Sequence, residues 1–225
     1  TGGHPVKCGL KHHANNGNGS LMRILPVAFV CHNNQITGEK RYELVKNISS
    51  LTHAHPISVL GCLIYTNFVC HLLGGDNPKE AYRKTQLDDY SMFEPEERSL
   101  YSRILKNQIY HYPKGYIPSR AYVIDTLEAV LWSFLTTDNF QDAVLTAVNL
   151  GDDTDTIGAL TGSLAGIQYG LKSIPEKWAT TLKRGRYLIK LCDQFAETEI
   201  DTTDISPEST SIPRIETTNL NRLGA

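Results

Sequence analysis

Apolar residues recur along most of the chain with the spacing of amphipathic α-helices. In the segment 39–53, for example, the apolar residues Tyr42, Val45, Ile48 and Leu51 follow one another at every third position. No segment shows the strict apolar–polar alternation that a half-buried strand or hairpin would need. The pattern therefore predicts an all-α protein with about eight helices around one core.

The other expected helices carry either an apolar stripe or a proline and acidic residues near their start. They are expected at 55–73, 76–86, 93–108, 118–135, 139–151, directly after 151, and at 174–196. The segment 55–73 is apolar nearly all round and starts with Pro56 at a position suited to the first helical turn. Asn67 and His71 interrupt it, so we interpret it as a buried central helix rather than a membrane span.

The chain changes character near its end. Residues 1–196 form the predicted helical domain, whereas residues 197–225 are rich in Ser, Thr, Asn and Pro. Such a composition is typical of disorder, so we expect this C-terminal tail to be ordered only where it packs on the domain or on a neighbour.

Composition excludes some partners. The chain has 225 residues, 40% of them apolar and 20% charged, and a formal net charge of −2. These values are typical of a soluble globular protein and give no electrostatic reason to expect nucleic acid or an anionic membrane. The five cysteines are scattered, odd in number and form no C-x-x-C pair, which favours free thiols and a cytoplasmic location.

Three aspartates and two threonines crowd into the stretch "DDTDT" at 152–156, just before a glycine-rich apolar run. A calcium-binding EF-hand loop is excluded, because Ile157 and Leu164 occupy two of its ligand positions. Capping of the next helix would explain one acidic residue, but not three that repel one another. Two carboxylates and a hydroxyl make a hard-oxygen set that suits Mg²⁺, and Asp153, Asp155 and Thr156 are the candidates. Simple capping remains the alternative.

The helix after the acidic stretch carries a glycine at every fourth position, namely Gly158, Gly162, Gly166 and Gly170. Each glycine inside a helix costs about 1 kcal/mol relative to alanine, and close approach of a neighbouring helix would offset that cost. We therefore expect a deeply buried helix that holds the acidic turn at the floor of a cleft.

A second candidate site is the loop 15–20, "NNGNGS", ahead of a short apolar helix that Pro26 is expected to kink or end. Its glycines let a ligand approach the backbone, and amide groups at a helix start suit a phosphate. An ordinary asparagine–glycine turn is the alternative. In "THAHP", His53 or His55 either contacts a substrate or caps the long helix that follows.

Five stretches together resemble, in order and spacing, the ADP-ribosylglycohydrolase family, which includes the dinitrogenase reductase-activating glycohydrolases. They are "NGNGSLMRILP", "THAHP", "YVIDTLEAVLW", "AVNLGDDTDTIGALTGSLAG" and "IPEKW". The resemblance covers about residues 13–192. It implies a compact all-α domain that binds two Mg²⁺ ions in a cleft. It also implies hydrolysis of the glycosidic bond between ADP-ribose and a protein side chain or another acceptor, so the expected partner is an ADP-ribosylated protein or an ADP-ribose-containing small molecule.

The resemblance assigns roles to individual residues. Asp153, Asp155 and Thr156 match metal ligands of the family, and the two aspartates are thereby the candidate catalytic residues. The positions that match the ADP-ribose site are Asn15, Asn16, Gly17, Asn18 and Gly19 in the loop, His53 near the phosphate, and Tyr122 lining the ligand. Two positions depart mildly from the family pattern, since Ala121 and Asp152 stand where glycine is usual.

The family pattern also has an N-terminal segment with a Thr-Asp-Asp ligand set and an acidic residue proposed to activate water. Nothing ahead of Thr1 matches that segment. We therefore expect at most one Mg²⁺ ion in this chain alone, little hydrolase activity, and the N-terminal segment itself as a partner. The alternative is a catalytically inactive ADP-ribose-binding or structural relative. A phosphohydrolase would need a base directed at phosphate, for which no candidate is found.

Overall fold

A computed structural model of the chain describes residues 5–198 and 200. This part of the chain forms α-helices and short 3₁₀ turns without any strand, which confirms the all-α prediction. The α-helices are α1 (Leu25–Asn33), α2 (Gly38–Ser50), α3 (Pro56–Leu73), α4 (Pro78–Leu87), α5 (Pro95–Leu100), α6 (Ser102–Leu105), α7 (Val123–Leu135), α8 (Phe140–Val148), α9 (Thr154–Tyr169), α10 (Glu176–Thr181) and α11 (Gly185–Ala196). Almost all of the predicted polar tail, 197–225, lies outside the described residues.

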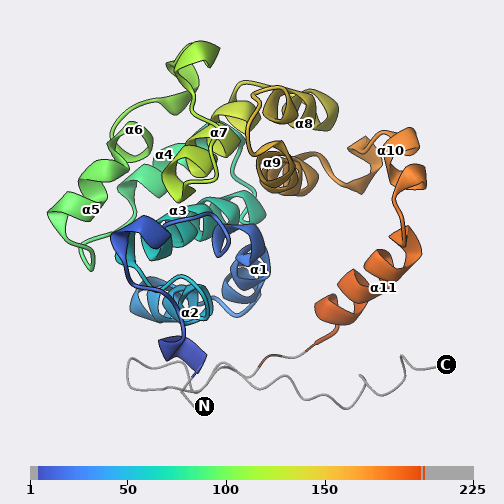
Figure 1. Cartoon of the computed structure of the whole chain (residues 1–225). Helices are drawn as coiled ribbons and strands as arrows, with labels where there is room; N and C mark the ends of the chain where they lie inside the picture. Colours follow the sequence, from blue (N-terminus) through green and yellow to red (C-terminus); the bar gives the residue numbers. More distant parts are fainter. Residues whose placement is uncertain (1–4, 199, 201–225) are drawn as a thin grey trace.

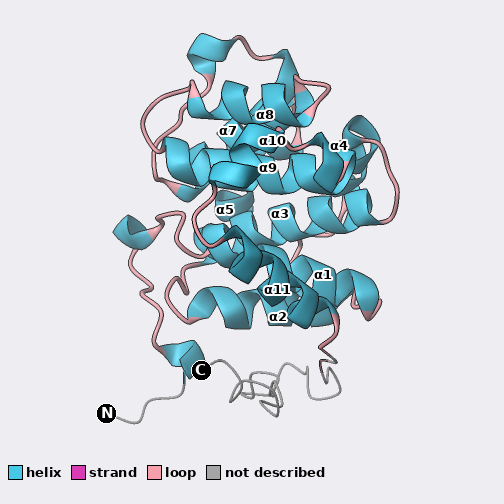
Figure 2. Cartoon of the chain, turned by 90° about the vertical axis from the view of Figure 1, so that its right-hand side faces the viewer, coloured by secondary structure: helices cyan, strands magenta, loops and turns pink. Residues whose placement is uncertain are grey.

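Helix α3 lies in the middle of the molecule. Figures 1 and 2 show α1 and α2 on one side of it and α7, α8 and α9 on the other, and α3 packs directly against α1, α2, α4 and α7. Its length and composition would allow a membrane crossing, but 83% of its residues are buried inside this fold. The prediction of a buried central helix is therefore confirmed.

The start of α3 shows which role His55 plays. The His55 ring nitrogen Nδ1 accepts a hydrogen bond of 3.2 Å from the backbone amide of Ile57, and Pro56 occupies the first helical turn. A side chain that accepts from an unpaired amide in this way is an N-cap. Of the two roles considered for His55, the structure thus supports capping.

The predicted effect of Pro26 is wrong. Pro26 lies in the first turn of α1 and begins that helix rather than ending one. The first-turn amides of a helix have no partner within it, so proline is tolerated there, and its fixed φ angle favours the helix. Ahead of it, Leu21–Arg23 forms only a single 3₁₀ turn.

The described chain has eleven α-helices rather than about eight, partly because two predicted helices are each split in two. The segment 93–108 divides at Tyr101, whose buried hydroxyl donates a 2.7 Å hydrogen bond to the Ile57 carbonyl of α3. That tertiary bond anchors the break between α5 and α6. The segment 174–196 divides at Arg184, whose φ of +58° is left-handed and ends helical geometry.

The described residues form one hydrophobic core, as predicted, but the apolar residues of α11 do not join it. Leu188 and Phe195 are 41% and 36% exposed, and neither α10 nor α11 contains a buried residue. Figure 1 shows α11 standing apart from the helices around α3. Trp178 of α10 does reach the body, where its ring lies 6.3 Å from that of Phe140 in α8.

Helix α9 packs along α8 and α7. A Cβ atom added at Gly158 would lie 2.8 Å from Val148 Cγ1 of α8, whereas one added at Gly166 would meet no atom within 4 Å. Gly170 ends the helix with a φ of +80°. Close helix approach therefore explains the glycine in the first turns of α9, and a left-handed helix end explains the last.

Candidate functional site

The acidic stretch forms a tight turn between α8 and α9. Gly151 has a φ of +96° and Asp152 one of +52°, so two successive residues are left-handed. Asp153 is the N-cap of α9, and its backbone amide donates a 3.0 Å hydrogen bond to the carbonyl of Ser119. The loop ahead of α7 thereby holds the turn in place.

Asp153 connects the acidic turn to the asparagine–glycine loop. Its carboxylate accepts hydrogen bonds from the Thr156 hydroxyl, at 3.2 Å, and from the side-chain amide of Asn18. The same Asn18 nitrogen also donates to the Thr126 hydroxyl of α7, at 2.8 Å. Asn18, Thr126 and Thr156 are all buried, so the two sequence-distant motifs share one polar network inside the fold.

Asp155 lies apart from this network. It is exposed on the first turn of α9, and its carboxylate makes no hydrogen bond within the described part of the chain. Within that part, no three His, Cys, Asp or Glu side chains gather closely enough to form a metal cluster. Chemically, two carboxylates and a hydroxyl within one helical turn are oxygen groups of the kind that bind Mg²⁺ together with water.

The asparagine–glycine loop runs antiparallel to the start of α7. Gly17 and Tyr122 form an isolated backbone bridge, flanked by 3.0 Å hydrogen bonds from the Asn18 amide to Ala121 and from the Val123 amide to Asn16. This pairing brings Tyr122 beside the loop.

Asn16 anchors the loop to helix α3. Its fully buried side chain donates to the His13 carbonyl and accepts from the Ser58 hydroxyl of α3, both at 2.8 Å. Asn15, in contrast, is only half-buried. A simple asparagine–glycine turn would not need two buried asparagines with these partners, so the loop is a rigid part of the fold.

His53 packs against the glycines of the loop. A Cβ atom at Gly19 would come within 2.8 Å of the His53 ring carbon Cε1, and one at Gly17 within 3.7 Å of Nε2. The glycines thus make room for this ring. Burial, together with the nearby charge of Arg23, lowers the pKa of His53, so the ring is neutral at pH 7.

Arg23 is a site residue that the sequence reasoning missed. Its guanidinium donates to the Gly19 carbonyl at 2.9 Å, to the end of α2, and to the Thr52 hydroxyl at 2.7 Å. The Thr52 oxygen in turn lies 2.7 Å from His53 Nδ1. Since Thr52 accepts from Arg23, its own proton is free to point at Nδ1, which favours the neutral His53 tautomer that carries its proton on Nε2.

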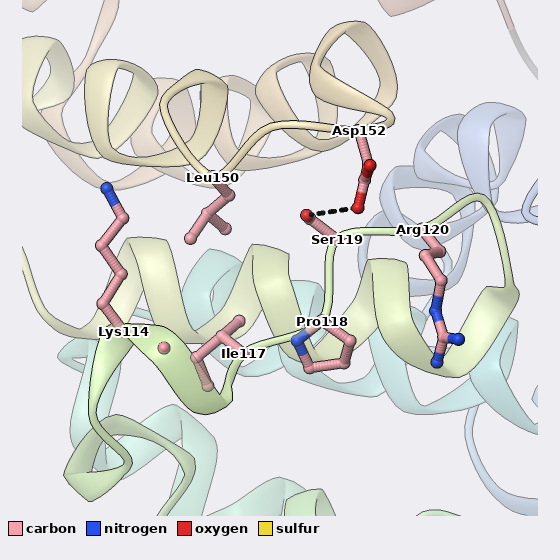
Figure 3. A pocket seen from close by; sticks show the side chains of 8 residues that line it. Lys114, Ile117, Pro118, Ser119, Arg120, Leu150 and Asp152 are labelled. Carbon is pink, nitrogen blue, oxygen red and sulfur yellow. Dashed lines mark hydrogen bonds between the residues drawn. The ribbon is translucent and has the colours of Figure 1, made fainter.

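A cavity of about 530 Å³ opens beside the acidic turn (Figure 3). Its walls come from the loop ahead of α7 and from the α8–α9 connection, and the lining residues are Lys114, Gly115, Ile117, Pro118, Ser119, Arg120, Leu150 and Asp152. The volume is that of a typical small-molecule pocket. None of the residues proposed from the sequence as ligands lines it, although Asp152 is the chain neighbour of Asp153.

The comparisons with known proteins agree with one another. The model of the family ADP-ribosylglycohydrolase matches residues 2–204. ADP-ribosylarginine hydrolase Tri1 of Serratia proteamaculans (strain 568) is 35% identical over 150 residues, which are 65% of this chain and 38% of that protein. The ADP-ribosyl-(dinitrogen reductase) glycohydrolase of Rhodospirillum rubrum is 33% identical over 166 residues, 74% of this chain and 50% of that protein.

The chain therefore spans half or less of the length of these two curated relatives. A solved structure named "ADP-ribosylglycohydrolase-related protein complex" superposes with a TM-score of 0.69 and 25% identity, and covers 82% of this chain and 61% of its own. The family match spans all of the described residues, including the loop, His53 and the acidic turn. The chain belongs to the ADP-ribosylglycohydrolase family.

Proposed function

We propose that this chain provides the ADP-ribose-binding loop and one Mg²⁺ site of an enzyme that hydrolyses the glycosidic bond between ADP-ribose and an arginine side chain of a protein. The observation that carries the proposal is the hydrogen bond from Asn18 to Asp153, which joins the ligand loop to the acidic turn. The name of the Serratia proteamaculans relative, an ADP-ribosylarginine hydrolase, supports arginine as the acceptor, and the name of the Rhodospirillum rubrum relative supports a protein-linked ADP-ribose.

The loop and His53 would hold the diphosphate. Backbone amides of a glycine-containing loop can approach phosphate oxygens closely. The neutral His53 ring, with its proton on Nε2, would add one donor on the side that faces Gly17 and Gly19. Holding the diphosphate in this way orients the distal ribose, and orientation by remote binding lowers the barrier at the reacting carbon.

The bond that breaks joins the anomeric carbon of the distal ribose to a nitrogen of the acceptor, and water supplies the new oxygen while the nitrogen leaves with a proton. The reacting carbon becomes oxocarbenium-like as its bond lengthens. Bound Mg²⁺ would polarise ribose hydroxyls or the leaving group and position a water. Asp153, Asp155 and Thr156 would hold the ion, and Asn18 keeps the Asp153 carboxylate in place.

The rival function is a catalytically inactive ADP-ribose-binding or structural relative. The test incubates an arginine-ADP-ribosylated protein with the chain in the presence of Mg²⁺ and measures the released ADP-ribose by chromatography. We expect little turnover by the 225-residue chain and restored turnover when the N-terminal segment typical of the family is fused or added in trans. Absence of turnover in both cases would favour the rival.

We also propose a cytoplasmic location. Cys31, Cys62 and Cys70 are buried, Cys192 is exposed, and none of the four forms a disulfide. Unpaired thiols of this kind persist in a reducing compartment.

A further inference from the structure

The cavity beside the acidic turn has two different ends (Figure 3). At one end, Asp152 and Ser119 lie next to the candidate metal ligand Asp153; at the other end stands Lys114. Ile117 and Leu150 form apolar walls between them. This open cavity thus combines a carboxylate next to the candidate metal ligand with two apolar side chains farther along its wall.

The carboxylate of Asp152 is available to a ligand. The residue is exposed, and the one hydrogen bond of its carboxylate within the described chain is a long one, 3.3 Å, from the Ser119 hydroxyl. The neighbouring cation does not neutralise it, because the Arg120 guanidinium is engaged by Asp125 at 2.7 Å. Asp152 is therefore a carboxylate that forms no ion pair within the described chain, although Lys114 lies at the other end of the same cavity.

The backbone does not need an aspartate at this position. The φ of Asp152 is +52°, a left-handed conformation that glycine adopts freely and that costs other residues about 1 kcal/mol or more, although Asp tolerates it better than most. Strained non-glycine residues persist mainly where the side chain has a function. The carboxylate, rather than the turn, is thus the feature that needs an explanation.

We propose that this cavity receives the acceptor side chain of the substrate and that Asp152 is the residue that selects a guanidinium there. An arginine side chain has three methylene groups and a planar guanidinium, which match the apolar walls and the carboxylate in that order. A carboxylate binds a guanidinium through two parallel charge-assisted hydrogen bonds, which a hydroxyl acceptor such as serine cannot form. The proposal rests on the proposed function and names the residue that sets its acceptor specificity.

The test compares the affinities of three ligands by calorimetry: ADP-ribose, ADP-ribosylarginine and ADP-ribosylserine. The variants are Asp152→Asn, which keeps the shape of the side chain, and Asp152→Gly, which also removes the left-handed strain. The matched control is Asp193→Asn, an exposed carboxylate on α11 that changes net charge equally and lies on a helix outside the cavity.

We expect the unaltered chain to bind ADP-ribosylarginine about tenfold more tightly than ADP-ribosylserine, the size of one charge-assisted interaction. Both Asp152 variants should lose that preference while keeping the affinity for ADP-ribose, and Asp193→Asn should keep both. A preference that survives in both Asp152 variants, or that is missing from the unaltered chain, would overturn the assignment of Asp152. Failure of the unaltered chain to bind ADP-ribose at all would instead overturn the proposed function.

Discussion

The contact between α8 and α9 carries the acidic turn, and its closeness can be tested by two matched substitutions in α9. Gly158→Ala places a methyl group 2.8 Å from Val148 Cγ1, closer than a carbon–carbon contact allows. Gly166→Ala, two helical turns later, places the same methyl where no atom lies within 4 Å. The two changes have equal chemistry and differ only in the space around them.

The expected free energies follow from two opposing effects. Alanine in place of a helical glycine stabilises by about 1 kcal/mol, and both variants gain this amount. Overpacking costs about 1–3 kcal/mol, and Val148, as a β-branched residue, has few alternative rotamers to relieve it. Gly166→Ala should therefore stabilise the fold by about 1 kcal/mol, while Gly158→Ala should destabilise it by about 1 kcal/mol.

Urea unfolding followed by circular dichroism measures both values, and the difference of about 2 kcal/mol corresponds to about 4–8 °C in melting temperature for a chain of this size. The double variant Gly158→Ala with Val148→Ala should recover part of the loss at Gly158, because it removes the clashing methyl. If Gly158→Ala is as stable as Gly166→Ala, α8 and α9 do not approach each other closely at Gly158, and close helix packing does not explain that glycine.

Three further predictions concern side chains around the site and the core. Asn18→Ala should cost about 2 kcal/mol in urea unfolding, because it removes the donor to Asp153 Oδ2 and to the Thr126 hydroxyl while Thr156 still bonds Asp153 Oδ1, and a cost near zero would contradict the network. His53→Ala should weaken ADP-ribose binding about tenfold in calorimetry while changing the melting temperature little; the opposite result would make His53 a purely structural residue. Burial raises the pKa of Glu128 to about 7, so its contribution to stability is present below its unfolded value of 4.5 and is lost as pH rises through 7. Glu128→Gln should therefore flatten the fall in stability between about pH 4.5 and pH 7, and an unchanged slope would refute the raised pKa.

The fold class and the buried position of α3 followed from the sequence because apolar spacing reports burial directly. Helix ends were harder to predict. The break at Tyr101 depends on a hydrogen bond to Ile57, which lies far away in the sequence. The break at Arg184 depends on a left-handed backbone conformation, which is hard to predict at a residue that is not glycine. The exposed apolar face of α11 was also missed, since periodicity predicts an amphipathic helix but not what covers it.

The two motifs of the candidate site were predictable from the sequence, but the contact between them was not. The loop with Asn18 and the acidic turn with Asp153 were found as separate motifs, and only the fold shows the hydrogen bond that joins them. Arg23 escaped notice because a single arginine in an apolar segment has no pattern of its own. The cavity beside Asp152 was missed for a different reason, since its walls come from two loops that are distant in the sequence.

The central claim is that the asparagine–glycine loop and the acidic turn act as one Mg²⁺-dependent ADP-ribose site. The most direct test is calorimetric titration of ADP-ribose into the chain, with and without Mg²⁺, for the unaltered protein and for Asp153→Asn. The account predicts that Mg²⁺ tightens ADP-ribose binding to the unaltered chain, that ADP-ribose tightens Mg²⁺ binding by the same factor, and that Asp153→Asn removes both effects. Equal ADP-ribose affinity with and without Mg²⁺, in both proteins, would contradict it.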